Sequence, residues 1–382
     1  MTGALDGIKI LEIANYVSGP FASVLLSDLG AEVVKIEEPK HGDPFRGWGP
    51  AEYSATFGSV NRNKQSVALD LKSKEGVEAA LRLADQADVL IENFRVGTLE
   101  RLGLGYDVLS KRNPRLIYCS ITAFGPTGPY AKRAGYDTVG QAMSGLLGLL
   151  TDFENPKPMG ISLSDHLTGM VACYGILGAL MARERTGRGQ RVETSLLQAT
   201  MSLMGENAAR YFEDKVVPAR ATRARSAQVF GFVDRDGKPF VVHLSSPPKF
   251  WQGLARVVGH PEWIDEERFV NKDARRKLYP ELSKMLADIF RTDTREHWLK
   301  LLLEADVPSG PIYNFDEVFE DPQVKHLKMR TDVPHPLVGS VGLISSGVNL
   351  SDTPAAIRSA APALGAHNED VLGGLMQPAT RR

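Results

Sequence analysis

The sequence predicts an α/β protein, in which a large domain with a doubly wound parallel sheet is joined to a smaller α+β domain. Three observations predict this class. A strand, a helix and a second strand follow one another between residues 8 and 36, which is the pattern of a parallel βαβ unit. Apolar strands and helices continue to alternate as far as residue 121. After residue 227, a hairpin followed by amphipathic helices indicates a separate small domain.

The elements of the large domain follow from hydrophobic periodicity and from residues that end helices. The first helix is expected to stop at Gly30, because glycine tolerates the left-handed conformation that closes many helices. The predicted elements are strands at 8–13, 31–36, 89–91 and 116–121, and helices at 21–29, 74–87, 165–186 and 196–204. Ligands of such sheets bind outside the carboxyl ends of the strands, so the turns after these strands are the first places to look for a site.

The second half of the chain divides into a linker, a small domain and a returning segment. Residues 211–227 are rich in charge and carry little periodicity, which is typical of a linker. Strands at 229–233 and 240–244 are expected to pair as a hairpin, with helices near 250–258 and 280–290. The last segment is too short to fold alone and should pack on the large domain. The predicted parts are 1–210, the linker 211–227, 228–325 and the return 326–382.

Composition excludes several classes of protein. The 382 residues carry 45 basic and 46 acidic side chains, so no global field attracts nucleic acid or an anionic membrane. Two cysteines, Cys119 and Cys173, exclude a disulfide scaffold. The start of the chain shows no signal-peptide pattern, and the apolar stretch 167–182 is shorter than the ~20 residues that span a bilayer. We expect a cytoplasmic protein without a membrane partner, in which this stretch is a buried helix.

A dinucleotide site and a metal site are both disfavoured. The turn at residues 15–20 lacks the glycine fingerprint G-x-G-x-x-G, and Pro20 has no backbone donor, although Glu37 lies about where a ribose-binding acid would. No two histidines have the spacing of metal ligands. We therefore expect no metal.

Two loops carry side chains that suit a phosphorylated, adenine-containing ligand. Asn93, Phe94 and Arg95 follow a strand directly, and Arg101 comes two helical turns later. An amide, a stacking ring and a guanidinium fit such a ligand, but the same residues also occur at an ordinary helix start. A second loop, punctuated by glycine and proline, is either a ligand clamp or a solvated connection. It carries Lys132, Arg133, Tyr136 and Asp137.

Asp165 is the strongest candidate for chemistry. It opens a helix that is otherwise apolar for about four turns. One interpretation is an N-cap whose carboxylate accepts backbone N–H groups. The other is a partly desolvated carboxylate nucleophile. Spacing alone leaves both open.

Short motifs in a shared order along nearly the whole chain resemble the class III CoA-transferase family. The motifs include Ser18-Gly19-Pro20, Asp28-Leu29-Gly30-Ala31, Val34-Lys35-Ile36-Glu37, Leu69-Asp70-Leu71-Lys72, Glu92-Asn93-Phe94, Gly135-Tyr136-Asp137, Asp165-His166, Thr186-Gly187-Arg188-Gly189-Gln190 and Val307-Pro308-Ser309-Gly310-Pro311. Each motif is weak by itself, and their common order carries the resemblance.

The resemblance implies a Rossmann-like large domain and an intertwined homodimer of two ring-like subunits. It also implies that Asp165 is the nucleophile and that coenzyme A is bound as a substrate, with no further cofactor. We combine the positions that match CoA-contacting residues of the family with candidates from the two loops described above. The predicted CoA contacts are then Val17, Ser18, Leu69, Lys72, Asn93, Phe94, Arg95, Arg101, Lys132, Tyr136 and Asp137. Glu38 stands where formyl-CoA transferase has a basic residue, so a phosphate contact there falls to Lys35 or Lys40 or is absent.

The activity that the resemblance implies is transfer of CoA between an acyl-CoA and a carboxylic acid, with succinyl-CoA or a similar donor. Asp165 would pass through an aspartyl anhydride and an aspartyl-CoA thioester. The alternative is an α-methylacyl-CoA racemase of the same superfamily. Racemases pair the aspartate with a histidine where this chain has Tyr136, and an unperturbed tyrosine with a pKa near 10 is a poorer proton shuttle. Tyr136 therefore favours transfer.

Overall fold

The computed structural model describes residues 3–50, 53–158 and 160–375, and these form two compact units. The first unit contains Met1–Leu147, Lys157–Ala209 and Lys325–Arg382, and the second contains Gly148–Pro156 and Arg210–Val324. Each unit has its own hydrophobic core. Every candidate site residue named above belongs to the first unit.

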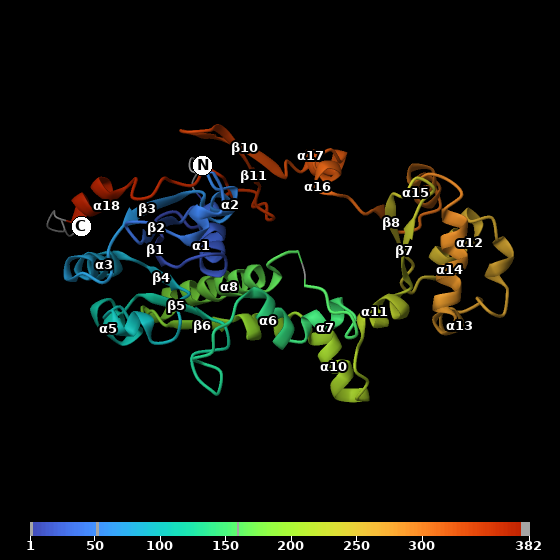
Figure 1. Cartoon of the computed structure of the whole chain (residues 1–382), viewed down its shortest axis with the longest axis horizontal. Coiled ribbons are helices and arrows are strands. Elements are labelled where there is room, and N and C mark those ends of the chain that lie inside the picture. Colours follow the sequence, from blue (N-terminus) through green and yellow to red (C-terminus); the bar gives the residue numbers. More distant parts are fainter. Residues whose placement is uncertain (1–2, 51–52, 159, 376–382) are drawn as a thin grey trace. The chain divides into compact units, whose positions relative to one another are not determined.

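The first unit is built on a six-stranded parallel sheet with the order β3-β2-β1-β4-β5-β6 (Figure 1). The strands are β1 Lys9–Ile13, β2 Glu32–Glu37, β3 Lys64–Ala68, β4 Val89–Glu92, β5 Ile117–Thr122 and β6 Arg191–Ser195. This is the order of the Rossmann arrangement, so the expected doubly wound α/β class is confirmed. The order reverses between β1 and β4, and a crevice forms at the carboxyl ends of those two strands.

The outer strands β3 and β6 were not among the predicted elements. Their sequences, Lys-Gln-Ser-Val-Ala and Arg-Val-Glu-Thr-Ser, lack the apolar run of a buried parallel strand. In β3, Lys64 and Ser66 are nevertheless buried, because Lys64 forms an ion pair with Glu12 of β1 and Ser66 donates a hydrogen bond to Glu37 of the adjacent strand β2. Buried polar partners therefore replace apolar packing at this edge.

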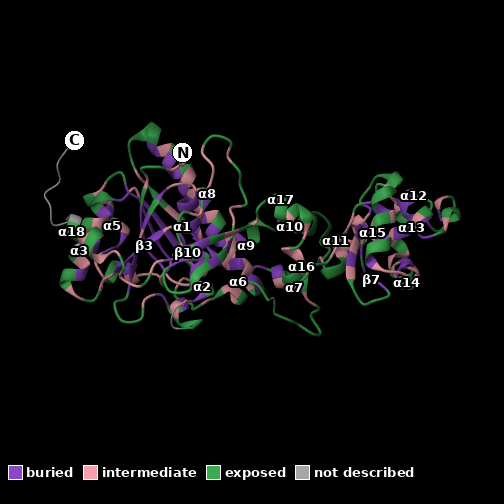
Figure 2. Ribbon diagram, turned by 90° about the horizontal axis from the view of Figure 1, so that it is seen from above, coloured by how far each residue is buried: buried purple, intermediate pink, exposed green. Residues whose placement is uncertain are grey.

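Helices cover both faces of the sheet, whose central strands are mainly buried (Figure 2). Ile10 and Val89 face α1 and α8, whereas Leu11 and Leu90 face α3 and α5. The helices of this part of the chain are α1 Ser18–Asp28, α2 Ala55–Asn61, α3 Lys74–Gln86, α4 Thr98–Arg101, α5 Tyr106–Arg112, α6 Asp137–Met143, α7 Leu146–Leu150, α8 Leu163–Thr186 and α9 Leu196–Ser202, with a 3-10 turn η1 at Pro44–Gly47.

The long helix α8, which was expected to be buried, is buried on one side only. It packs against α1, β5 and β6, whereas Met170, Tyr174 and Met181 are 54%, 70% and 64% exposed. By length and composition alone α8 could cross a membrane, and no other helix in the described residues could. Its inner face instead belongs to the core of the first unit.

The helices α1 and α8 approach each other closely at Gly169. A Cβ atom at this position would lie 2.8 Å from the carbonyl oxygen of Ser18 and 3.2 Å from the nitrogen of Ala22. We expect Gly169→Ala to lower the free energy of unfolding by about 1–3 kcal/mol, because backbone must shift to admit the methyl group. In Gly373→Ala, where nothing lies within 4 Å, the same change should raise it by about 0.5–1 kcal/mol. Urea denaturation of both variants tests this, and equal effects would contradict it.

The second unit is a small antiparallel sheet packed against helices, so the predicted hairpin is confirmed. Its strands pair in the order β7-β8-β9, and aromatic rings such as Phe240, Trp251 and Phe290 form its core. The elements here are β7 Val229–Val233, β8 Pro239–His243, β9 Ser309–Pro311, α12 Pro248–Val257, a 3-10 turn η2 at Pro261–Ile264, α13 Lys272–Lys277, α14 Tyr279–Phe290, α15 Arg295–Glu304, α16 Phe315–Val318 and α17 Pro322–His326. The segment predicted as a linker is largely helical, with α10 Gly205–Asp214 and α11 Arg220–Ala227.

The last segment belongs to the first unit. It contains the hairpin β10 Arg330–His335 and β11 Gly339–Ile344, and the helix α18 Asn368–Leu375. The backbone N–H of His367 donates to Ser66, and the side chain of Asn368 accepts from the N–H of Ala68. These bonds attach the segment to the edge strand β3. The predicted part 326–382 extends to residues 376–382, which lie outside the described residues.

Candidate active site

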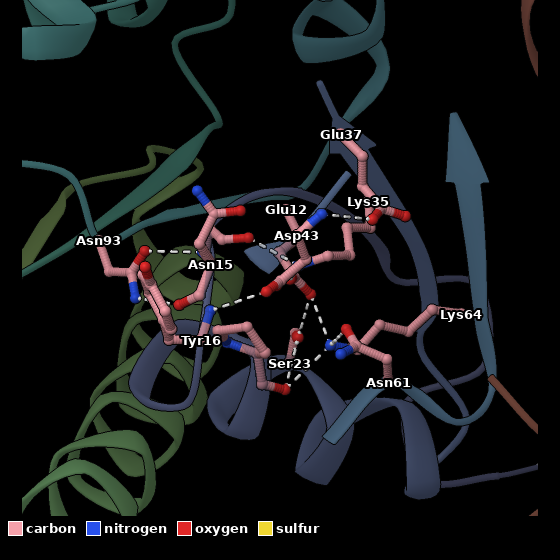
Figure 3. Close-up of polar contacts among 12 residues, drawn as sticks. Glu12, Asn15, Tyr16, Ser23, Lys35, Glu37, Asp43, Asn61, Lys64 and Asn93 are labelled. Carbon is pink, nitrogen blue, oxygen red and sulfur yellow. Dashed lines mark hydrogen bonds and ion pairs between the residues drawn. The ribbon is translucent and has the colours of Figure 1, made fainter. Parts of the chain in front are cut away.

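The loops after the two central strands, β1 and β4, are joined by one side chain. Asn93 follows β4, and its amide oxygen accepts the backbone N–H of Asn15 at 2.9 Å. Its amide nitrogen donates to the carbonyl of Asn15 at 2.7 Å and to the hydroxyl of Ser18 at 3.3 Å (Figure 3). The side chain of Asn93 therefore fixes the loop after β1 at the point where the strand order reverses.

A cavity of about 360 Å³ opens at this point and contains Asp165; we call it the aspartate cavity. Six of the residues predicted from the sequence line it, namely Ser18, Asn93, Phe94, Arg95, Tyr136 and Asp165. Residues that sequence reasoning did not select also line it, among them Asn15 and Tyr16 from the loop after β1. Their position directly after the first strand was the available signal.

Asp165 is the third residue of α8 and not its N-cap. The N-cap is Ser162, whose own side chain makes no capping bond. Within the described part of the chain, no donor lies within hydrogen-bond distance of the Asp165 carboxylate. The backbone N–H of Asp165 donates to the Asp137 carboxylate at 3.1 Å. The carboxylate is thus free of the capping bonds that the structural interpretation required.

Burial, and to a smaller extent the neighbouring Asp137 carboxylate, together raise the pKa of the Asp165 carboxyl to about 7. The position of Asp165 in the first turn of a helix favours the charged form, but here desolvation dominates. Asp137 is held in turn by Gln141, whose amide donates to it at 2.6 Å. A carboxylate with a raised pKa and no hydrogen bonds is a better nucleophile than a solvated one.

A second cavity, of about 340 Å³, lies at the carboxyl ends of β2, β3 and β4; we call it the strand-end cavity. Leu69, Lys72, Phe94 and Arg101 line it, and all four were predicted as CoA contacts. Asn15 and Phe94 line both cavities. A single extended ligand that passes Asn15 and Phe94 can therefore occupy both.

Three predicted residues line neither cavity. Val17 packs in a small core with Phe45 and Phe57, Lys132 is exposed, and Asp137 contacts the backbone of Asp165. Val17 is the N-cap of α1, so it directly precedes the backbone amide groups that begin that helix.

The structure excludes Lys35 as a phosphate ligand, which corrects one of the sequence alternatives. Lys35 is 1% exposed, and its ammonium pairs with Glu12 at 2.6 Å and with Asp43 at 3.0 Å. Glu38 is exposed and accepts the backbone N–H of His41 at 2.7 Å. Lys40 is exposed and stays a candidate. Sequence reasoning could not see that Lys35 is buried, because its partners come from distant positions.

Glu37 was considered as a ribose-binding acid, but both of its carboxylate oxygens already accept hydrogen bonds from other side chains of the protein. Arg46 donates to both of its carboxylate oxygens at 2.7 Å. The Ser66 hydroxyl donates to one of them at 2.6 Å. Burial opposes the charged form, but Arg46 and Lys35 outweigh it and lower the pKa of Glu37. Glu37 therefore fixes the loop after β2.

Glu92, at the end of β4, is a buried acid that the sequence analysis named within a motif without giving it a role. Its carboxylate accepts the Ser120 hydroxyl of β5 and the backbone N–H of Phe94. Burial raises its pKa to about 7, against the effect of these two donors. Glu92 thus holds the turn that carries Asn93, Phe94 and Arg95.

The described residues contain no group of three or more metal-ligating side chains. Both cysteines are buried and free, and burial raises the pKa of the Cys173 thiol to about 11. The described residues that line the two cavities include the Asp165 carboxylate, the guanidinium groups of Arg95, Arg101 and Arg133, the Lys72 ammonium and aromatic rings.

Comparison with known proteins defines the class to which this fold and site belong. The model of CoA-transferase family III matches residues 5–368. The human succinyl-CoA:glutarate CoA-transferase is 35% identical over 96% of this chain and 85% of its own length. The formyl-CoA:oxalate CoA-transferase of Streptomyces coelicolor is 36% identical over 97% of this chain and 95% of its own.

Solved structures agree with the fold. A CaiB/BaiF family protein from Brucella suis superposes with a TM-score of 0.88 at 34% identity, covering 98% of this chain and all of its own. The chain belongs to CoA-transferase family III. It is a CoA-transferase that acts between acyl-CoA and carboxylic acids.

Proposed function

We propose that the chain transfers CoA through covalent intermediates on Asp165. The Asp165 carboxylate attacks the carbonyl carbon of the donor acyl-CoA, forms an aspartyl–acyl anhydride and releases CoA thiolate. The thiolate then attacks the aspartyl carbonyl, which gives an aspartyl-CoA thioester and the free donor acid. The acceptor carboxylate runs the same two steps in reverse. The observation that supports this most is the Asp165 carboxylate, which lines a cavity and accepts no hydrogen bond from the described residues.

The exchange needs no external energy source, because an anhydride and a thioester are both activated acyl compounds. The protein must exclude water from them, since hydrolysis would waste the thioester. The apolar walls of the aspartate cavity, which include Ile121, Ala123 and Leu196, suit that task. No cofactor besides CoA takes part in the proposed route.

We place the nucleotide end of CoA in the strand-end cavity and its thioester end in the aspartate cavity. The two cavities share Asn15 and Phe94, so the pantetheine chain would pass between them. Lys72 and Arg101 are the cations of the strand-end cavity. The Arg101 guanidinium bonds to the Thr98 hydroxyl at 3.1 Å, and within the described residues no carboxylate pairs with it. It is therefore available to a phosphate.

Replacing Arg101 by alanine should raise KM for acyl-CoA about tenfold or more and leave kcat nearly unchanged. The contact of Arg101 with a CoA phosphate would stabilise the bound substrate and the transition state equally, so its loss weakens binding without changing the barrier between them. Steady-state kinetics with varied acyl-CoA measures both constants. Arg82→Ala is the matched control, since Arg82 is an exposed arginine on α3 whose partner is Glu78. An unchanged KM in Arg101→Ala would remove this residue from the CoA site.

The proposed substrates are succinyl-CoA or a similar donor and a small carboxylic acid, with a dicarboxylate favoured. Two relatives at 34–35% identity are named for succinyl-CoA with glutarate or with D-citramalate. Arg95 and Arg133 line the aspartate cavity. Arg133 lies over the rings of Phe124 and Tyr130, and in the described residues neither arginine pairs with a carboxylate. A guanidinium of this kind suits the second carboxylate of a dicarboxylic acid.

We also propose that the chain forms the interlocked homodimer expected from the family resemblance, and that it works in the cytoplasm. The exposed apolar face of α8, with Met170, Tyr174 and Met181, is the supporting observation, because such a face is usually covered. Light scattering on the purified protein tests the dimer.

The transferase reaction is tested by incubating the protein with succinyl-CoA and a panel of carboxylic acids and by following new acyl-CoA species by mass spectrometry. Acceptor-dependent formation of a new acyl-CoA supports the proposal. A parallel reaction of an α-methylacyl-CoA in D₂O tests the racemase alternative. Deuterium at Cα without any CoA exchange would overturn the transferase assignment for this chain.

A further inference from the structure

Four charged side chains form a buried cluster beneath the loop after β1. They are Glu12 of β1, Lys35 of β2, Lys64 of β3 and Asp43 of the loop after β2, each at most 3% exposed (Figure 3). Both carboxylate oxygens of Glu12 are used, one by Lys35 at 2.6 Å and the other by Lys64 at 2.7 Å. Asp43 completes the cluster through Lys35, at 3.0 Å.

Such a cluster is costly to bury, and apolar side chains of the same size stabilise a core as well or better. Stability alone therefore does not account for it. Burial opposes charge on Glu12, but Lys35 and Lys64 outweigh it and lower the pKa of Glu12 to about 2. Glu12 is thus charged at neutral pH, and its bonds to Lys35 and Lys64 fix the geometry of the cluster.

The cluster reaches the active-site loop through two of its members. The Lys35 ammonium donates to the carbonyl of Ala14 at 2.6 Å. The Asp43 carboxylate accepts the backbone N–H of Tyr16 at 3.3 Å and that of Phe45 at 3.0 Å. From the opposite side, Asn93 binds both backbone groups of Asn15. Three consecutive residues of the loop are therefore held from two directions.

Tyr16 has a φ of 64°, a left-handed conformation that a residue with a bulky side chain rarely adopts. Such a conformation persists only where the surroundings impose it, and it gathers at functional sites. Its ring meets the ring of Tyr136 edge-on at 6.1 Å and that of Phe45 at 5.4 Å. Tyr16 and Tyr136 line the aspartate cavity together with Asp165.

We propose that Asp43 is a positioning residue, which acts with Lys35 to hold Tyr16 in its left-handed conformation, so that the Tyr16 ring forms a wall for the acyl group beside Asp165. The inference rests on the proposed role of Asp165 as the nucleophile. Asp43 touches no substrate in this account. It acts through the backbone of Tyr16 alone.

A double-mutant cycle between Asp43 and Tyr16 tests this route. Glycine adopts a positive φ without cost, so Tyr16→Gly removes both the ring and the need for a clamp. We expect Asp43→Asn to lower kcat about tenfold and Tyr16→Gly to lower it at least as much. The double variant should then match Tyr16→Gly within about twofold. If the two effects multiply instead, Asp43 does not act through Tyr16 and the proposal is overturned.

Asp28→Asn is the matched control for a purely structural effect. Asp28 is also a buried carboxylate, paired with Arg62 at 2.6 Å, but it stands at the far end of α1 from the loop. Both asparagine variants should lower Tm, and only Asp43→Asn should lower kcat per folded molecule, with the Kd of free CoA changed less than about threefold. Equal kcat in the two variants would overturn the proposal.

If Asp43→Asn does not fold, Tyr16→Gly decides alone, because an unchanged kcat in that variant removes the wall that Asp43 is proposed to hold. Kinetics use the donor and acceptor that the panel of acids identifies. Trapping of an acyl group on Asp165 of the wild-type protein is measured separately. If no acyl group is trapped, the proposal that Asp165 is the nucleophile fails. The double-mutant cycle still shows whether Asp43 acts on kcat through Tyr16.

Discussion

Replacement of Asp165 by alanine should lower kcat for CoA transfer by at least about 10⁴-fold, because no other carboxylate of the described residues lines the aspartate cavity. The Kd of free CoA, measured by calorimetry, should change less than about threefold, because the strand-end cavity is left intact. The protein should fold normally, since Ser162 and not Asp165 is the N-cap of α8.

Asp107→Ala is the matched control for this loss. Asp107 is likewise an aspartate in the first turn of a helix, α5, but it is exposed and lies in neither cavity. It should retain wild-type turnover. Turnover above about 1% of the wild type in Asp165→Ala would contradict the covalent route.

Asp165→Asn should make the protein more stable at alkaline pH while leaving it inactive. The folded pKa of Asp165 is about 7, well above the value of about 3.9 in an unfolded chain. Between these values the unfolded chain releases a proton that the folded protein retains. The contribution of protonated Asp165 to the free energy of unfolding is therefore fully present below about pH 4, and it is lost as the pH rises to about 7.

The asparagine variant carries no proton to lose, so its advantage over the wild type should appear between about pH 4 and 7 and then stay constant. With allowance for the partial exposure of Asp165, we expect about 2 kcal/mol at pH 8 and almost none at pH 4. Glu92, whose pKa is also about 7, titrates equally in both proteins and cancels in the difference. Urea titrations at pH 4 and pH 8 measure the difference in free energy of unfolding between the variant and the wild type. The same difference at both pH values would refute the raised pKa of Asp165.

The same pKa sets the acid limb of activity. Because only the carboxylate attacks, kcat/KM should fall about tenfold per pH unit below about pH 7. A wild-type rate that is flat between pH 5 and 7 would show that Asp165 is already ionised there.

The central sheet was predictable to the extent that its strands are apolar. The strands β1, β2, β4 and β5 are rich in apolar residues although they include charged ones such as Glu12 and Lys35, and glycine follows the first helix near the predicted position. The strand β3 was missed because Lys64 and Ser66 make it look polar, although both side chains are buried against carboxylates. A pattern of single residues does not contain the partner that makes a buried charge tolerable.

The candidate site was predictable as a set of residues but not as a set of roles. Asn93 was selected as a ligand amide, whereas in the structure its amide groups bind the backbone of Asn15. Asp137 was selected for CoA and is found on the backbone of Asp165. Lys35 was considered for a phosphate and is buried in an ion pair. The contacts that assign these roles join residues 23 to 78 positions apart, and only the folded chain displays them.

The most direct test of the covalent account is mass spectrometry of the wild-type protein after incubation with succinyl-CoA and trapping with borohydride or hydroxylamine. The account predicts a modification that maps to Asp165, that increases when the acceptor acid is omitted, and that is absent from Asp165→Ala. An acceptor-dependent transferase reaction with no modification on Asp165, or with one on another residue, would contradict it.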